Sequence, residues 1–275
     1  MTKYGPATEA KIDETVRACD RYGQSAIIAL AGVPGTGKSY VAWIAAQRFA
    51  ADPLMVKEIQ FHQSFSYEEF IEGLRISEDG TVIQPGAFLE WNTRALDDPD
   101  HRYVLLIEEL TRANLAAVLG ELLTFVEYRD RPFVTTYSRK PTQVAQNLCL
   151  LATFNPTDRS AIEIDAALLR RLRVIPCPPS VDQLSEMLQG RGIRPEVISK
   201  LQEIFRECVK SPDYEYLMPF GHGIFSDVRA EQPDLHDLWE ERIRHFLRRP
   251  LFEPNPFADL IKRLYPWRDA GFTLP

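Results

Sequence analysis

Several features that define other classes of protein are missing from this chain of 275 residues. No apolar run approaches the roughly 20 residues that a membrane-spanning helix needs, and the N-terminal stretch is polar and charged, so we expect neither a membrane span nor a secretory signal. The four cysteines (Cys19, Cys149, Cys177 and Cys208) show no Cys-x-x-Cys or Cys/His spacing, which argues against a zinc site or a disulfide framework. We expect them to be buried or incidental thiols of a cytoplasmic protein.

The 39 acidic residues outnumber the 32 Lys and Arg residues. The net charge is −7 and no long basic run is present, so the composition does not predict direct nucleic-acid binding, although a local basic pore could lie inside an acidic total. With 45% hydrophobic and 26% charged residues, and no visible repeat, the chain has an ordinary globular composition. Its length suffices for one large α/β domain and a smaller second domain.

Five short apolar runs predict strands, at residues 26–31, 55–61, 103–107, 148–154 and 173–175. The intervals between them contain helix-like patterns, and several runs are almost continuously apolar. Strands buried on both faces are typical of a parallel sheet wrapped by helices. We predict these helices at about residues 10–22, 38–50, 66–74, 114–128 and 162–172, the third of which begins with the capping pair Ser66 and Glu69.

A proline-rich stretch, Pro176-Cys-Pro-Pro179, follows the fifth strand and predicts a linker because it cannot continue a helix. Beyond it the pattern becomes helical, at residues 181–189, 195–210, 235–249 and 256–264. We therefore predict an α/β nucleotide-binding domain over residues 1–177 and an all-helical lid domain over residues 178–275.

A phosphate-binding pattern, G-x-x-x-x-G-K-[ST], lies between the first predicted strand and the helix that follows it. Glycines allow a tight loop whose backbone N–H groups converge on phosphates, and the helix N-terminus adds positive potential there. The lysine should reach the β- and γ-phosphates, and the serine hydroxyl should bind Mg²⁺. The predicted binding residues are Gly32, Val33, Pro34, Gly35, Thr36, Gly37, Lys38, Ser39 and the adjacent Tyr40.

Two carboxylates, Glu108 and Glu109, end the apolar strand at residues 103–107. Charged pairs at strand ends are often only solvated surface, but a phosphate loop upstream calls for an acidic element on a neighbouring strand. We predict that Glu108 takes the metal side and that Glu109 is the general base that orients the attacking water.

Three further polar residues follow the fourth predicted strand. Asn155 is placed to hold the attacking water or the γ-phosphate, or it is only a turn residue before Pro156. Arg170 and Arg171 lie at the end of a predicted helix, where a cation complements the helix dipole. Alternatively, one of them is an arginine finger that reaches the γ-phosphate of a neighbouring subunit.

In this order, the motifs resemble an AAA+ ATPase of the McrB-like branch, near the MoxR ATPases. The segments that carry the resemblance are residues 32–39, 61–73 (FHQSFSYEEFIEG), 106–114 with 120–122, 136–138, 152–160 and 219–225. The resemblance implies that Asn155 is sensor 1, that Arg171 has the finger position, and that Arg170 and Arg159 face a subunit interface. It also implies that residues 73–91 hold an insert in the second helix, a candidate pore element.

One departure from the family concerns the metal side. The family usually has Asp then Glu, whereas this chain has Glu108 then Glu109. The extra methylene shifts the carboxylate by more than about 1 Å, roughly one bond length, which matters for an octahedral Mg²⁺ shell. Two alternatives to a fast NTPase therefore follow from Glu108: an enzyme that hydrolyses nucleotide slowly, and a protein that binds nucleotide mainly as a switch. Because only a short segment precedes the phosphate loop, we expect no DNA-reading domain there.

The resemblance implies an oligomeric motor, a hexameric ring, that uses ATP or GTP with Mg²⁺ to drive a partner protein or polymer. A McrBC-like restriction or anti-phage complex would supply a separate nuclease or recognition subunit, with DNA reached only through that partner or the pore. The alternatives are a MoxR-type remodeller and a non-hydrolysing assembly module. The family includes GTPases and ATPases; we favour ATP, and the phosphate loop does not decide the base.

Overall fold

A computed structural model describes residues 5–77, 80–156, 166–209, 220–228 and 241–242. The chain divides into two compact units. The first unit comprises Met1–Ala10, Gly32–Gly37 and Cys177–Pro275, and the second comprises Lys11–Ala31 and Lys38–Pro176. The predicted boundary at residue 177 remains a prediction, because the first unit also includes the phosphate loop and the start of the chain.

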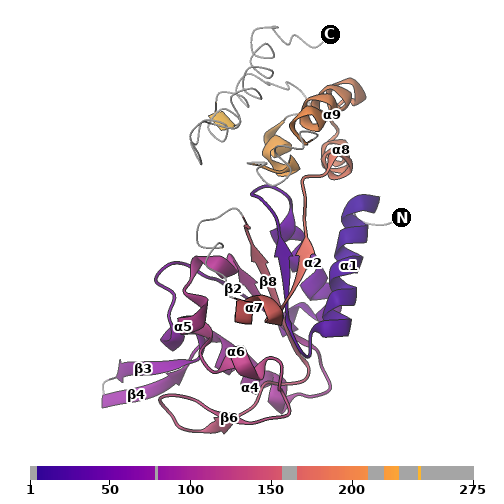
Figure 1. Cartoon of the computed structure of the whole chain (residues 1–275). Helices are drawn as coiled ribbons and strands as arrows, with labels where there is room; N and C mark the ends of the chain where they lie inside the picture. The colour runs from indigo at the N-terminus through magenta and orange to yellow at the C-terminus, as the bar shows by residue number, and fades with distance from the viewer. Residues whose placement is uncertain (1–4, 78–79, 157–165, 210–219, 229–240, 243–275) are drawn as a thin grey trace. The chain divides into compact units, whose positions relative to one another are not determined.

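A five-stranded sheet forms the centre of the second unit (Figure 1). Its strands run in the order β2-β5-β8-β1-β9, and every neighbouring pair is parallel. The strands are β1 (Ile27–Ala31), β2 (Val56–Gln60), β5 (Tyr103–Glu108), β8 (Leu148–Phe154) and β9 (Leu172–Pro176). All five predicted strands are present, which confirms the α/β fold with a parallel sheet.

Both faces of the sheet are covered. β5 and β8 are buried along their whole length, as their continuous apolar runs predict. Helix α2 (Lys38–Ala50) contacts β5 and β8, while α4 (Ala87–Asp97) joins the hydrophobic cluster on the opposite face through Phe88, Trp91 and Ala95. Helix α1 (Pro6–Tyr22) precedes β1. Because the strands are parallel and packed on both faces, their carboxyl ends lie together at one edge of the sheet.

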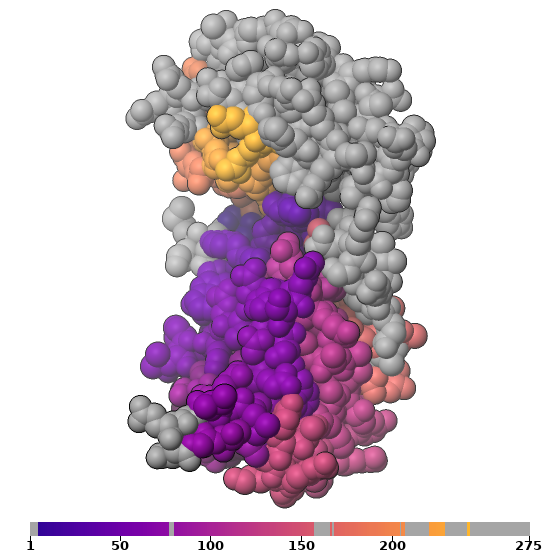
Figure 2. Space-filling view, turned by 90° about the vertical axis from the view of Figure 1, so that its left-hand side faces the viewer, coloured from indigo at the N-terminus to yellow at the C-terminus, as the bar shows by residue number. Residues whose placement is uncertain are grey.

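The predicted helix at residues 66–74 is wrong in its second half. Helix α3 is only Tyr67–Phe70, although Ser66 N–H donates to Glu69 Oε2 at 3.0 Å, which confirms the capping pair. The chain then forms an antiparallel hairpin of β3 (Glu72–Ser77) and β4 (Gly80–Pro85). The hairpin extends from the rest of the unit in Figure 1, and its side of the molecule faces the viewer in Figure 2.

The predicted helix at residues 114–128 is divided into two. Helix α5 (Leu115–Leu119) stops at Gly120, whose φ is 47°, and α6 (Leu122–Phe125) begins beyond it. A Cβ on Gly120 would lie 2.8 Å from the ring of Tyr67, so this position requires glycine. Short elements complete the unit: η1 (Pro53–Met55), η2 (Leu110–Arg112), β6 (Phe133–Val134), β7 (Pro141–Thr142) and α7 (Ala166–Arg171).

The first unit contains two longer helices after the proline-rich linker, α8 (Val181–Gly190) and α9 (Pro195–Val209), as predicted. Ser180 caps α8 by accepting the N–H of Gln183 at 3.2 Å. A 3₁₀ turn, η5 (His222–Asp227), follows. The helices predicted at residues 235–249 and 256–264 fall almost wholly outside the described residues. Among those residues, no helix is long and apolar enough to cross a membrane.

A buried arginine ties together the loops at the amino end of the sheet. The guanidinium of Arg129, 2% exposed, donates to the carbonyls of Gly23 (2.7 Å), Val126 (3.3 Å), Ala145 (2.9 Å) and Leu148 (2.6 Å). These carbonyls come from three separate segments of the chain. The amino end of the sheet is therefore crosslinked by one side chain.

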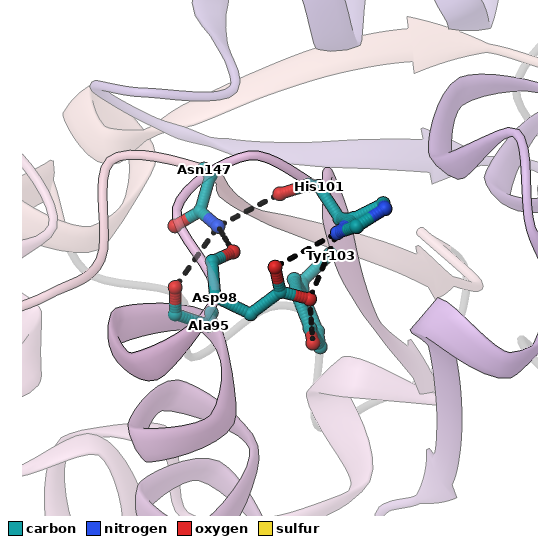
Figure 3. Close-up of polar contacts among 5 residues, drawn as sticks. All are labelled: Ala95, Asp98, His101, Tyr103 and Asn147. Carbon is teal, nitrogen blue, oxygen red and sulfur yellow. Dashed lines mark hydrogen bonds and ion pairs between the residues drawn. The ribbon is translucent and has the colours of Figure 1, made fainter.

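The loop into β5 is held by an asparagine and an aspartate (Figure 3). Asn147 Nδ2 donates to the carbonyls of Ala95, Asp98 and His101 at 3.0, 2.9 and 2.8 Å. The Asp98 carboxylate accepts the Tyr103 hydroxyl at 2.8 Å and lies 2.8 Å from Nδ1 of His101. Because the amide has two hydrogens and three carbonyl partners, one hydrogen is shared between two carbonyls. These contacts join the loop before β5 to the loop before β8.

Candidate functional site

Three side chains meet at the carboxyl edge of the sheet. Ser39 lies in the first turn of α2, Glu108 ends β5, and Thr153 lies near the end of β8. Ser39 Oγ donates to Glu108 Oε2 at 2.8 Å, and Thr153 Oγ1 donates to the same oxygen in a very short contact. β5 and β8 are neighbouring parallel strands, which places their ends side by side. The predicted metal-side residues Ser39 and Glu108 are therefore in direct contact.

The other oxygen of Glu108 is available. Glu108 is 8% exposed, and its buried Oε1 has no hydrogen-bond partner among the residues that the structure describes. A buried carboxylate oxygen without a partner is unfavourable unless a ligand satisfies it. Carboxylate and hydroxyl oxygens are the ligands that Mg²⁺ takes, together with water and substrate phosphates. The residues present therefore fit a magnesium ion.

Thr153 was not singled out in the sequence as a site residue. It is fully buried, and its hydroxyl, besides donating to Glu108, accepts the backbone N–H of Glu109 at 3.4 Å. One hydroxyl therefore holds both glutamates. The only indication in the sequence is a polar residue near the end of an otherwise apolar strand.

Glu109 has an unusual backbone conformation. Its φ of 57° and ψ of 45° are left-handed, a region that costs a residue with a side chain about 1 kcal/mol. Its Oε2 accepts from Nε of Arg112 at 3.1 Å, a partner that the sequence did not indicate. Strained backbone is common at functional sites, where surrounding contacts maintain it. The conformation turns the chain sharply just beyond Glu108.

Asn155 follows directly after β8 and is 8% exposed. It is one residue beyond the strand that neighbours β5, so its backbone lies at the same edge of the sheet as Glu108 and Glu109. The burial distinguishes it from an ordinary exposed turn residue. The role predicted for Asn155 stays a prediction.

The predicted arginines differ in their surroundings. Arg170 and Arg171, at the end of α7, both pair with the Glu127 carboxylate, at 2.9 and 3.2 Å. The Arg171 side chain is 9% exposed, whereas that of Arg170 is 63% exposed. Arg159 lies outside the described residues. In this conformation the side chain of Arg170 is thus the more exposed of the two.

The phosphate loop has the backbone that its glycines predict. Gly35 and Gly37 have φ values of 81° and 76°, which favour glycine. The hydroxyl of Thr36, 2% exposed, donates to the carbonyl of Val33 at 3.0 Å and so closes the loop internally. Lys38, which begins α2, is 7% exposed and makes no ion pair among the described residues. Tyr40 is half exposed.

Comparisons with known proteins agree with this architecture. The chain is 33% identical over 252 residues to the Type IV methyl-directed restriction enzyme EcoKMcrB subunit of Escherichia coli (strain K12), a match that covers 86% of this chain and 55% of that protein. It is 20% identical over 281 residues to the Type II restriction enzyme BsuMI component YdiS of Bacillus subtilis (strain 168), covering 84% of this chain and 80% of that protein. The chain thus spans about half the length of the first relative.

Residues 27–172, more than half of the chain, match the AAA domain family in its dynein-related subfamily. This segment begins with β1 and ends at the first residue of β9, so it contains four of the five strands of the sheet, α2 and both glutamates. The chain therefore belongs to the AAA family, dynein-related subfamily, as an McrB-like member.

Proposed function

We propose that the chain is an oligomeric AAA+ NTPase that binds ATP or GTP with Mg²⁺, hydrolyses it, and uses the cycle to drive a partner protein or a polymer. The observation that carries this proposal is the contact of Ser39 with Glu108 at the end of β5, with Glu108 Oε1 left open. In the sequence, Ser39 directly follows the glycine loop and lysine that define a phosphate-binding motif.

Each residue has a role in this proposal. Ser39 and Glu108 hold Mg²⁺, which when bound neutralises charge on the β- and γ-phosphates. Lys38 pairs with the phosphates, and a buried lysine with no ion pair among the described residues suits an anionic ligand. Glu109 accepts a proton from the attacking water, and Asn155 positions that water.

Assembly would complete the site. An arginine from a neighbouring subunit would stabilise charge on the γ-phosphate, and a ring, six-membered by resemblance, would provide that neighbour. The guanidinium of Arg170 is the more exposed of the two, although it too would have to leave Glu127. Arg171, which the resemblance favours, would first have to leave Glu127.

The two relatives are named as parts of restriction enzymes. By extension we propose that this chain is the motor subunit of a restriction or anti-phage complex, with a nuclease or recognition subunit on another chain. Contact with DNA would then occur through that partner or through the pore.

A second candidate is an assembly module that binds nucleotide with little turnover. The Glu109–Arg112 pair favours it, because the carboxylate that should activate water is engaged by a cation instead. Fast hydrolysis would need either the second oxygen of Glu109 or release of Oε2 from Arg112 to accept the proton of the water.

Steady-state turnover of ATP and of GTP, over a series of protein concentrations, tests these proposals. If an arginine acts between subunits, activity per chain must rise as the chain goes from monomer to oligomer. Glu109→Gln should abolish turnover and leave nucleotide binding intact. A flat profile across the assembly range rules out the arginine in trans. No turnover by the wild type, even with partners, favours the assembly module.

A further inference from the structure

A Gly-His-Gly turn in the first unit contacts the phosphate loop of the same unit. The N–H of Gly221 donates to the carbonyl of Pro34 at 2.7 Å, and the N–H of Gly223 donates to the carbonyl of Gly35 at 2.6 Å. These two carbonyls belong to the loop whose N–H groups should meet the phosphates. A peptide whose carbonyl is fixed on one side has its N–H fixed on the other. The turn therefore fixes the orientation of two peptide planes in the loop.

Both glycines of the turn are required by this close approach. A Cβ on Gly221 would lie 2.4 Å from the backbone of Gly35, and a Cβ on Gly223 would lie 2.8 Å from the carbonyl oxygen of Gly35. Any side chain at either position would push the turn away from the loop. The two glycines of Gly-His-Gly thus allow the turn to contact the phosphate loop.

The residue between these glycines, His222, is buried, with 6% of its surface exposed. Its Nδ1 accepts the backbone N–H of Ser180 at 3.4 Å. Burial lowers the pKa of His222 to about 4, although the charge of Glu186 opposes that shift. The Glu186 carboxylate is itself occupied, since it accepts the N–H of Ala7 at 2.6 Å and both the N–H and the hydroxyl of Thr8.

The lowered pKa and the contact with Ser180 assign the state of the imidazole at neutral pH. The ring is uncharged, and because Nδ1 is an acceptor, the single ring proton is on Nε2. Nε2–H has no hydrogen-bond partner within the described part of the chain. It faces Gly37, since a Cβ built on Gly37 would lie 3.6 Å from it. A donor with no hydrogen-bond partner among the described residues therefore lies beside the last glycine of the phosphate loop.

We propose that His222 is a nucleotide-binding residue whose neutral imidazole donates Nε2–H to the phosphate chain of a bound nucleoside di- or triphosphate. Gly221 and Gly223 hold the loop and the histidine together, so the same turn shapes the phosphate cradle and contributes a side-chain donor to it. This inference rests on the proposed nucleotide-binding function. It adds a contact from beyond the matched residues 27–172.

Two substitutions of His222 separate its two nitrogen atoms. His222→Asn keeps a polar atom near the position of Nδ1 and removes the donor at Nε2. His222→Gln reaches the position of Nε2 with a donor and removes the acceptor for Ser180. His101→Asn, at an exposed histidine of the other unit, is the matched control. All are made in the full chain.

Calorimetric binding of ADP and of GDP with Mg²⁺ provides the readout, because diphosphates bind without turnover. A hydrogen bond to a charged acceptor predicts that His222→Asn raises Kd about tenfold or more, while His222→Gln stays within about threefold of the wild type. The control should leave Kd unchanged. Equal Kd for His222→Asn and the wild type overturns the proposal. A wild type that binds neither diphosphate nor triphosphate defeats the proposed function instead.

Nitrogen NMR of the wild-type histidines gives a test that needs no variant. The resonances of His222 should show a proton on Nε2 in the free protein and should shift when ADP or GDP is added. Should His222→Asn fail to fold, this measurement decides alone. A protonated Nδ1, or no shift of Nε2 on saturation with nucleotide, overturns the proposal.

Discussion

The hydroxyl of Thr153 offers a sharp test of how the metal side is built, because it holds both glutamates at once. It donates to the Glu108 carboxylate and accepts the N–H of Glu109. Thr153→Val replaces the hydroxyl by a methyl of nearly the same shape. A hydrogen bond to a charged group contributes about 1.5–3 kcal/mol, so we expect a loss of stability of about 2–3 kcal/mol.

Thr153→Ser is the matched variant, since it keeps the hydroxyl and removes one methyl. At a fully buried position that deletion costs about 1 kcal/mol. If only hydrophobic burial mattered, valine would be the better replacement. If the hydroxyl holds Glu108, serine is the better one. The two explanations therefore predict opposite orders of stability for the same pair of variants.

Urea unfolding of the three proteins measures this order, and titration of Mg²⁺ into the nucleotide-bound protein gives a second readout. We expect wild type, then serine, then valine in stability, and the weakest Mg²⁺ dependence for valine. A valine variant as stable as the serine variant, or more stable, would refute the assigned role of the hydroxyl.

Three further predictions concern other polar contacts. Arg129→Met should destabilise the protein by about 3 kcal/mol in thermal unfolding, because buried carbonyls lose their donor. The Asp98 carboxylate raises the pKa of His101, so the stability lost in His101→Ala should be largest just below the ordinary histidine pKa of about 6.5 and disappear as pH rises through the raised value; unfolding at about pH 6 and pH 9 checks this. Arg171→Ala should cost about 2 kcal/mol of stability, because it removes a buried ion pair with Glu127. Arg170→Ala should cost less than about 0.5 kcal/mol, because its pair is exposed. If Arg170 acts between subunits, Arg170→Ala should lower turnover without this loss of stability.

The central sheet could be predicted from the sequence because burial on both faces demands continuous apolar runs. β5 and β8 have no exposed residue, and their sequences show it. The β3–β4 hairpin could not be predicted in the same way. Every described residue of β4 is exposed, so no requirement for burial imposes an apolar pattern on its sequence. Its base is held instead by Glu72, which accepts the N–H groups of Tyr137 and Ser138.

The candidate site divides in the same manner. The phosphate loop, Ser39 and Glu108 could be predicted from local sequence. The loop and Ser39 follow from the spacing of the glycines, and Glu108 follows directly after an apolar run. The contributions of Thr153 and Glu127 depend on contacts across distant segments, which no local pattern reports. Arg112 is near Glu109 in sequence, yet the pairing depends on the left-handed turn between strand and helix, a conformation that the sequence did not indicate.

The geometry of the site shows how a glutamate can replace the usual aspartate of the family at position 108. Its longer side chain reaches the Ser39 hydroxyl directly, at 2.8 Å, and still leaves Oε1 open. A hydroxyl has one hydrogen and two lone pairs, so Ser39 can donate to Glu108 and offer a lone pair to Mg²⁺ at the same time. The extra methylene is therefore compatible with metal binding. If Glu109 is the general base, its pairing with Arg112 is the contact at which a motor and a switch would differ.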